Sequence, residues 1–175
     1  MSGADRTNSV VIPGSFDPIT VGHMDIITRA AAMFDKVYVA VMINDMSRYA
    51  EGAVDKTYLF DREERLCFAT AACAHLPNVE VLTAEGRLID LVDRLGVVAI
   101  VKGVRNAVDF EYEQKHALWN RAHNRHAETL YLPADPSLAE VSSTAVREAL
   151  TSGGDLHGLV PPAVAELCRK SDKIR

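Results

Sequence analysis

Short apolar runs alternate with longer amphipathic segments along the chain, and this alternation limits the folds open to it. Residues 9–12 are predicted to form a buried strand that stops at Pro13-Gly14. Residues 22–34 place their apolar side chains on one helical face, and residues 36–43 are rich in β-branched side chains, as in a strand. Strands alternating with helices predict an α/β fold whose parallel strands are joined by right-handed crossovers.

The same pattern continues to the end of the chain. Further strands are predicted at 79–82, 97–101 and 129–132, and further helices at 61–74, 88–95, 110–123, 143–150 and 162–169. We therefore expect a Rossmann-like, doubly wound, five-stranded parallel sheet in a single domain spanning residues 1–175. Ligands of such sheets bind outside the carboxyl ends of the strands, where strand order reverses. The loops after strands one, two, four and five are thus the places to search for chemistry.

Composition excludes several classes of protein. A formal net charge of −5 argues against a nucleic-acid binder, and no stretch approaches the roughly 20 apolar residues of a membrane span. The polar N-terminus lacks the apolar core of a signal peptide. Cys67, Cys73 and Cys168 have no C-x-x-C spacing, which argues against a disulfide framework or a zinc knot and favours reduced, buried thiols. We expect a cytoplasmic protein that binds neither nucleic acid nor membrane.

The first loop, Pro13 to His23, carries the strongest chemical signal. Gly14 permits a sharp turn, and Ser15 and the backbone around Phe16 offer hydrogen-bond donors. His23 falls in the first turn of the following helix, where free N–H groups attract anions, and its ring N–H can reach a phosphate oxygen. The alternative is a Gly/Pro turn with a structurally satisfied histidine, which the length of the whole run disfavours.

Two further segments resemble phosphate sites. Lys102 and Arg105 flank Gly103 at the end of the fourth predicted strand, where two cations and backbone N–H groups could bind phosphates. The hydroxyl-rich stretch from Ser142 to Arg147 begins a helix and suits a triphosphate. Taken alone, the first could equally be a solvated basic loop and the second a simple N-cap.

The string PGSFDPITVGHMDII at 13–27 resembles the phosphopantetheine adenylyltransferase family, within the nucleotidyltransferases that carry a T-x-G-H signature. The resemblance extends over nearly the whole chain, and its later motifs fall in order. They are EER at 63–65, AHLPNVEV at 74–81, VKGVR at 101–105, DFEYE at 109–113, NR at 120–121, VSSTAVRE at 141–148 and GGDLHGLVPPAV at 153–164.

This resemblance implies transfer of AMP from ATP to 4′-phosphopantetheine, giving dephospho-coenzyme A and pyrophosphate with Mg²⁺ as cofactor. The acceptor phosphate would attack the α-phosphorus in line, and His23 would stabilise the transition state. A homohexamer inhibited by coenzyme A is also implied. The implied ATP-binding residues are Ser15, Phe16, His23, Gly103, Val104, Arg105, Glu113, Ser142, Ser143 and Thr144, and the implied acceptor-binding residues are Ser15, Ser47, Leu88 and Lys102.

The chain departs from the family pattern in two places. The family carries a catalytic lysine soon after the second strand, whereas the corresponding stretch here ends in Ser47-Arg48 within a longer loop. Either Arg48 or Lys56 could take the catalytic role, and Lys56 is favoured because it lies just before the re-aligned Leu59-Phe60. The second departure is Leu138-Ala139-Glu140, whose negative charge could alter the nucleotide contacts.

Two other functions remain open. A relative with another acceptor or nucleotide, such as a cytidylyltransferase or a nicotinamide-mononucleotide adenylyltransferase, is disfavoured by DFEYE and VKGVR. A nucleotide-binding module without catalysis could result from the altered loop. His116, His123 and His126 are spaced so that they could share a helical face, but solvated histidines are the more common explanation, and we expect no protein-bound metal.

Overall fold

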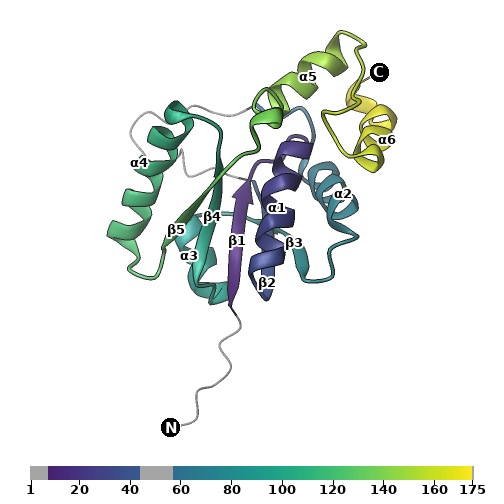
Figure 1. Ribbon diagram of the computed structural model, residues 1–175. Coiled ribbons are helices and arrows are strands. Elements are labelled where there is room, and N and C mark those ends of the chain that lie inside the picture. Colours follow the sequence, from purple (N-terminus) through teal and green to yellow (C-terminus); the bar gives the residue numbers. More distant parts are fainter. Residues whose placement is uncertain (1–7, 44–56, 175) are drawn as a thin grey trace.

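A computed structural model describes residues 8–43 and 57–174, and its five strands form one parallel sheet in the order β3-β2-β1-β4-β5 (Figure 1). The strands are β1 (Ser9–Gly14), β2 (Lys36–Met42), β3 (Val79–Ala84), β4 (Ala99–Val104) and β5 (Thr129–Pro133). This arrangement confirms the predicted doubly wound α/β fold. Strand order reverses between β1 and β4, so the carboxyl ends of these two strands mark the expected ligand site.

Helices cover both faces of the sheet because alternate strand residues point to opposite sides. Val10 and Ile12 pack into the larger core, which also takes apolar residues from α1, α2, α5 and α6, while Val11 packs into the smaller core together with residues of α3 and α4. The helices are α1 (Val21–Met33), α2 (Arg62–Cys73), α3 (Leu88–Leu95), α4 (Ala107–His123), α5 (Ser143–Thr151) and α6 (Pro162–Lys170). Among the described residues, short 3-10 segments lie at Pro136–Leu138 and Asp172–Ile174.

Two strand ends differ from the predictions. β1 continues through Pro13 and Gly14, which pair with β2, whereas pairing with β4 is limited to Val10 and Val11. Because proline has no N–H to donate, it ends the hydrogen bonding of β1 with β4, while β1 continues along β2. β4 in turn continues through 102–104, beyond the predicted strand 97–101, because β5 pairs with it as far as Pro133.

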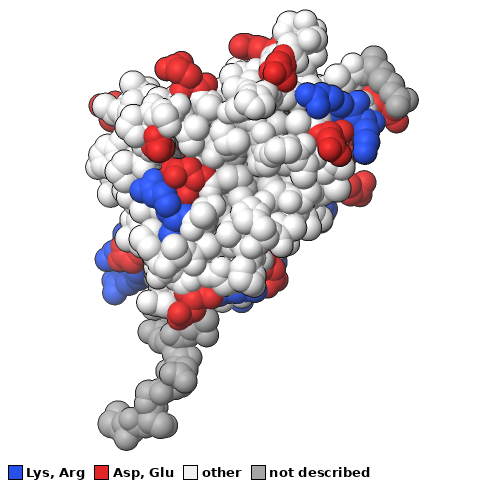
Figure 2. Space-filling view, turned by 45° about the vertical axis from the view of Figure 1, so that its right-hand side comes forward, with Lys and Arg blue, Asp and Glu red and all other residues white. Residues whose placement is uncertain are grey.

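Helix α4 begins before the predicted Phe110, because the side chain of Asn106 accepts the N–H of Asp109 and caps the helix at Ala107. Cys73 and Cys168 are buried as expected, whereas Cys67 is exposed. On the face shown in Figure 2, acidic and basic side chains form small neighbouring groups rather than one extended basic area. In the part of the chain that the structure describes, no helix is both long and apolar enough to cross a membrane.

Candidate active site

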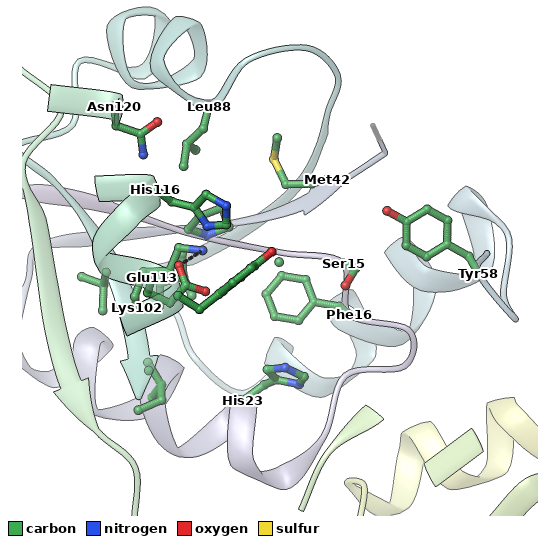
Figure 3. Close-up of a pocket in the computed structure, with 17 residues that line it drawn as sticks. Ser15, Phe16, His23, Met42, Tyr58, Leu88, Lys102, Glu113, His116 and Asn120 are labelled. Atoms are coloured by element: carbon green, nitrogen blue, oxygen red, sulfur yellow. Dashed lines mark ion pairs between the residues drawn. The ribbon is translucent and has the colours of Figure 1, made fainter. Parts of the chain in front are cut away.

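Two adjoining pockets open at the carboxyl edge of the sheet, beside β1 and β4. The first pocket has a volume of about 260 Å³ and lies between the first loop and α4 (Figure 3). The second has a volume of about 500 Å³ and reaches the start of α5. Six residues line both pockets: Ser15, His23, Tyr58, Gly103, Tyr112 and Glu113. A group held in one pocket therefore meets a group held in the other at this shared boundary.

Thr20 and His23 form a capping box at the start of α1. The Thr20 hydroxyl oxygen accepts the His23 N–H at 3.3 Å, and His23 Nδ1 accepts the Thr20 N–H at 3.0 Å. Because Nδ1 serves as an acceptor, a neutral ring carries its proton on Nε2. The capping box thus fixes both the ring and its tautomer, and leaves Nε2 as a donor for the pockets that His23 lines.

The pKa of His23 is lowered from 6.5 to about 4, first by burial of the ring and then by the positive charge of Arg105. A histidine with this pKa is neutral at physiological pH. It can therefore donate a hydrogen bond to an anion without taking up a proton first.

The Phe16 side chain packs back onto Gly14, near the start of the first loop. Its φ of 46° is in the left-handed region, which is uncommon for residues other than glycine and costs free energy at functional turns. The ring is buried, meets His23 edge-on at 5.1 Å, and packs so closely on Gly14 that a Cβ there would lie 2.8 Å from Phe16 Cζ. Position 14 must therefore be glycine, because any larger residue would collide with the Phe16 ring that packs against His23.

Lys102 and Glu113 form an ion pair in the wall of the first pocket (dashed line in Figure 3), with Nζ and Oε2 separated by 3.0 Å. Both side chains are about one-fifth exposed, so water only partly screens the pair. The sequence resemblance gives Lys102 to the acceptor and Glu113 to ATP, whereas in the structure the two side chains pair with each other. An anion that binds Lys102 must therefore compete with Glu113.

Arg105 lines the second pocket, where its guanidinium binds Asp109 at 2.7 Å. This hydrogen bond is the main reason that the pKa of Arg105 is raised, with Glu140 adding a smaller effect. Glu140 thus acts electrostatically on a cation that lines the pocket. An effect of Leu138-Ala139-Glu140 on the nucleotide contacts stays a prediction.

The hydroxyl groups at the start of α5 serve mainly to hold the structure. Ser142 caps the helix by accepting the Ala145 N–H, and the Ser143 hydroxyl donates to the Pro18 carbonyl at 2.9 Å. Thr144 accepts a hydrogen bond from Arg147 and keeps its own proton to donate. The N-termini of α1 and α5 therefore meet at the second pocket, which both helices help to line.

Comparison with known proteins agrees with this geometry. The cytidylyltransferase-like family matches residues 11–149. A phosphopantetheine adenylyltransferase from Nocardioides sp. is 46% identical over 88% of this chain and 91% of its own length. Another, from Limosilactobacillus reuteri, is 38% identical over 91% of this chain and 87% of its own. The chain belongs to the phosphopantetheine adenylyltransferase family.

The fold is also found in more distant proteins. A Vibrio parahaemolyticus structure described as a candidate nicotinate-nucleotide adenylyltransferase aligns with a TM-score of 0.70, at 18% sequence identity. The alignment covers 95% of this chain and 94% of that one. At this identity the likeness shows a shared fold alone. Membership of the phosphopantetheine adenylyltransferase family makes the chain a nucleotidyltransferase.

The structure brings together most of the residues that the family resemblance selects. Phe16, Leu88 and Lys102 line the first pocket, Arg105, Ser142, Ser143 and Thr144 line the second, and Ser15, His23, Gly103 and Glu113 line both. Val104 lines neither pocket, and its carbonyl accepts the N–H of Ala134. Ser47, Arg48 and Lys56 lie outside the described residues, so their roles remain predictions.

Sequence reasoning did not select several other residues that line the pockets. Tyr112, His116 and Asn120 come from α4, and Tyr58 lies just before α2. Asp17 belongs to the first loop and Arg147 to α5. The signal for the first three was their spacing of three to four residues along one helix, in register with Glu113. Asn120 is also part of the Asn120-Arg121 motif that resembles the family, which was a further signal.

Asn120 and Asp17 differ in how their buried polar atoms are used. Asn120 is 3% exposed, and its Oδ1 has no hydrogen-bond partner within 8–43 and 57–174. The buried Asp17 carboxylate accepts the N–H groups of Leu59 and Phe60, each at 2.9 Å, and lies 3.5 Å from Arg147. Asp17 is therefore engaged with protein groups, whereas Asn120 presents an unused polar atom to the first pocket.

In the part of the chain that the structure describes, no group of three or more histidine, cysteine or acidic side chains is arranged to hold a metal ion. Of the three histidines considered from sequence, His123 stacks on Trp119 and His116 packs against Tyr112. His126 follows the end of α4.

Proposed function

We propose that the protein transfers the adenylyl group of ATP to 4′-phosphopantetheine, releasing pyrophosphate and giving dephospho-coenzyme A. One observation carries this proposal: two pockets of different character share a boundary that contains Ser15, His23 and Gly103. Transfer between two substrates requires both reacting groups to meet at one place, and this boundary provides it.

The second pocket suits ATP. The N-termini of α1 and α5 both contribute to it, and free backbone N–H groups at helix starts favour a polyphosphate. Arg105 adds a positive charge, although Asp109 and Glu140 partly offset it. Of the two cavities it is the larger, as a nucleoside triphosphate requires.

The first pocket suits the acceptor. Lys102 supplies a cation for the phosphate end, and the apolar side chains of Met42 and Leu88 line the pocket toward α3 (Figure 3). The unused Oδ1 of Asn120 is an acceptor for an amide N–H, and pantetheine contains two amides. A phosphorylated, amide-containing chain thus matches the polar and apolar groups of this pocket.

The phosphate of the acceptor is itself a nucleophile, so no protein nucleophile is needed. It attacks the α-phosphorus in line, and one bond to the pyrophosphate leaving group breaks as the new phosphoanhydride bond forms. His23, held neutral with its proton on Nε2, donates to oxygens on which negative charge develops. Catalysis by this chain then consists of positioning and of electrostatic stabilisation.

Mg²⁺ is expected to enter with the nucleotide, as MgATP, and to neutralise part of the phosphate charge. Asp17, the buried carboxylate of the first loop, is occupied by backbone N–H groups and Arg147, so it is not free to bind a metal. The metal would therefore bind mainly to substrate oxygens.

We further propose that the protein is a cytoplasmic homohexamer. Coenzyme A, which resembles the product, would bind to it as an inhibitor. Support for self-association comes from exposed apolar side chains on α4 and the edge strand β5. Val108 is 75% exposed, Leu118 65% and Leu130 43%. Light scattering coupled to size-exclusion chromatography tests the assembly, and a monomer would contradict it.

The decisive assay measures pyrophosphate release on mixing the protein with ATP, Mg²⁺ and 4′-phosphopantetheine. Release with another phosphorylated acceptor only would indicate a different substrate, and nucleotide binding without release would indicate a module that has lost catalysis. In an active enzyme, His23→Ala should lower kcat by roughly 10²–10³, the usual effect of losing one transition-state donor.

The loop cation can be assigned in the same assay. Arg48→Ala and Lys56→Ala are measured separately, and the variant that keeps wild-type kcat is excluded from the catalytic role. We expect Lys56→Ala to show the larger loss.

A further inference from the structure

Arg65, in α2, is one of the largest fully buried side chains, with 2% exposure. Within residues 8–43 and 57–174 no carboxylate forms an ion pair with it. Its Nη1 instead donates to the Ser15 carbonyl at 2.7 Å and to the Met42 carbonyl at 3.0 Å. Its guanidinium also lies 4.1 Å from the centre of the Tyr58 ring. Burying a cation away from a counter-charge is costly, so the contacts it makes must matter to the protein.

The three partners of Arg65 belong to three separate segments around the pockets. Ser15 is in the first loop, Met42 ends β2, and Tyr58 precedes α2, and all three line the first pocket. Burial lowers the pKa of Arg65, while Tyr58, Asp17 and Asp61 act in the opposite direction. The side chain is thus a buried link between the first loop and the neighbouring wall of the site.

The carbonyl that Arg65 binds is half of the peptide unit between Ser15 and Phe16. A trans peptide is planar, and its N–H points away from its carbonyl oxygen. With the Ser15 oxygen held on the α2 side, the Phe16 N–H is directed to the opposite side. It has no acceptor in the part of the chain that the structure describes, and the positive φ of Phe16 shows that this peptide is held in an unusual orientation.

We propose that Arg65 is a positioning residue for adenylyl transfer. It holds the carbonyl of Ser15, which lines both pockets, and thereby directs the N–H of the adjoining Phe16 toward a phosphate bound beside Ser15. The inference rests on the proposed function, since it takes that phosphate to belong to ATP. Arg65 itself contacts no substrate. Its guanidinium suits this role because one nitrogen donates to two carbonyls while the planar group stacks on Tyr58. A lysine has a shorter side chain and no planar group, so it does not reproduce this arrangement.

The direct test follows the Phe16 amide by NMR. Phe16 is the only phenylalanine preceded by serine, so labelling with carbonyl-¹³C serine and ¹⁵N phenylalanine isolates its amide signal in a deuterated sample. We expect ATP with Mg²⁺ to move the Phe16 amide proton downfield in the wild type, and Arg65→Lys to remove most of that shift. An unchanged signal in the wild type, or an equal shift in the variant, would overturn the proposal.

Kinetics provide the second readout. Arg65→Lys should lower kcat by about tenfold or more, the typical cost of losing one hydrogen bond to a charged group, while KM for 4′-phosphopantetheine stays within about twofold. Arg62→Lys is the matched control, since Arg62 is in the same helix but exposed and paired with Glu85. Its kinetics and Phe16 signal should stay as in the wild type.

A general loss of folding would lower apparent kcat at unchanged KM, so kcat is expressed per folded protein as measured by circular dichroism. The response of the single Phe16 amide is the readout that partial unfolding does not mimic. If Arg65→Lys does not fold, Arg65→Met serves instead, since it keeps an unbranched side chain but has neither the charge nor a hydrogen-bond donor. Equal kcat in the folded variant and the wild type would refute the positioning role. If the wild type releases no pyrophosphate, the proposed function fails, yet the Phe16 response to ATP still decides the role of Arg65.

Discussion

Lowering the pH of the ligand-free protein should destabilise it through His23. The pKa of His23 is about 4 in the folded protein against 6.5 for an ordinary histidine, mainly because burial disfavours the charged ring. Between pH 6.5 and 4 the unfolded chain therefore binds more protons at this site than the folded one. The stability that the neutral ring contributes is fully present above pH 6.5 and is lost as pH falls through this window.

The size of the effect follows from the two pKa values. At pH 5 the unfolded histidine is almost fully charged, while the folded one is still neutral, so the free energy of unfolding falls by about 2 kcal/mol relative to pH 8. This figure is an upper limit, because the His23 side chain is partly exposed to water, which screens its charge.

His23→Gln isolates the contribution. Glutamine is a usual third residue of a capping box, so it can accept the Thr20 N–H and still offer a neutral donor, yet it does not titrate. Denaturant unfolding of the wild type and the variant from pH 8 to 5 should give free energies of unfolding that separate toward acid pH, by up to about 2 kcal/mol at pH 5. His75→Gln, which replaces an exposed histidine, should leave the pH dependence close to that of the wild type.

NMR titration of the His23 ring provides the independent check. A ring pKa near or above 6.5 in the ligand-free protein, or parallel unfolding curves for the wild type and His23→Gln, would refute the argument. It would also remove the basis for treating His23 as a neutral donor.

Three further predictions concern the surroundings of the pockets. Gly103→Ala places a Cβ 2.7 Å from Ile26 Cγ1, so we expect a loss of about 1–3 kcal/mol in denaturant unfolding, and unchanged stability would contradict the packing. Asp17→Asn leaves one of two buried backbone N–H groups without its acceptor, and should cost about 1–3 kcal/mol in the same measurement, whereas a smaller loss would mean that water replaces the carboxylate. Glu113→Gln removes the competitor for Lys102, and should lower KM for 4′-phosphopantetheine by up to about fivefold, the range of a partly exposed ion pair, with a raised KM counting against it.

The sequence predicted the sheet and most of the site because both depend on local patterns. The alternation of strands and helices placed the loops at one edge, and the segment 13–23 has its chemistry within one turn and one helix start. Strand ends were less predictable, since Pro13 and the segment 102–104 are strand only where a neighbouring strand pairs with them. The capping role of His23 was missed because its partner, Thr20, was considered only as part of the motif.

What the sequence determined alone is the class of fold, the position of the helix starts expected to bind phosphate, and the family. What only the tertiary structure decided is which side chains meet. Ser143 reaches the carbonyl of Pro18 across 125 positions of sequence, and Lys102 pairs with Glu113 although each was assigned to a different substrate. The buried contacts of Arg65 are likewise visible only in three dimensions. Local periodicity specifies elements, whereas contacts between loops depend on the order in which strands pack, which no local pattern records.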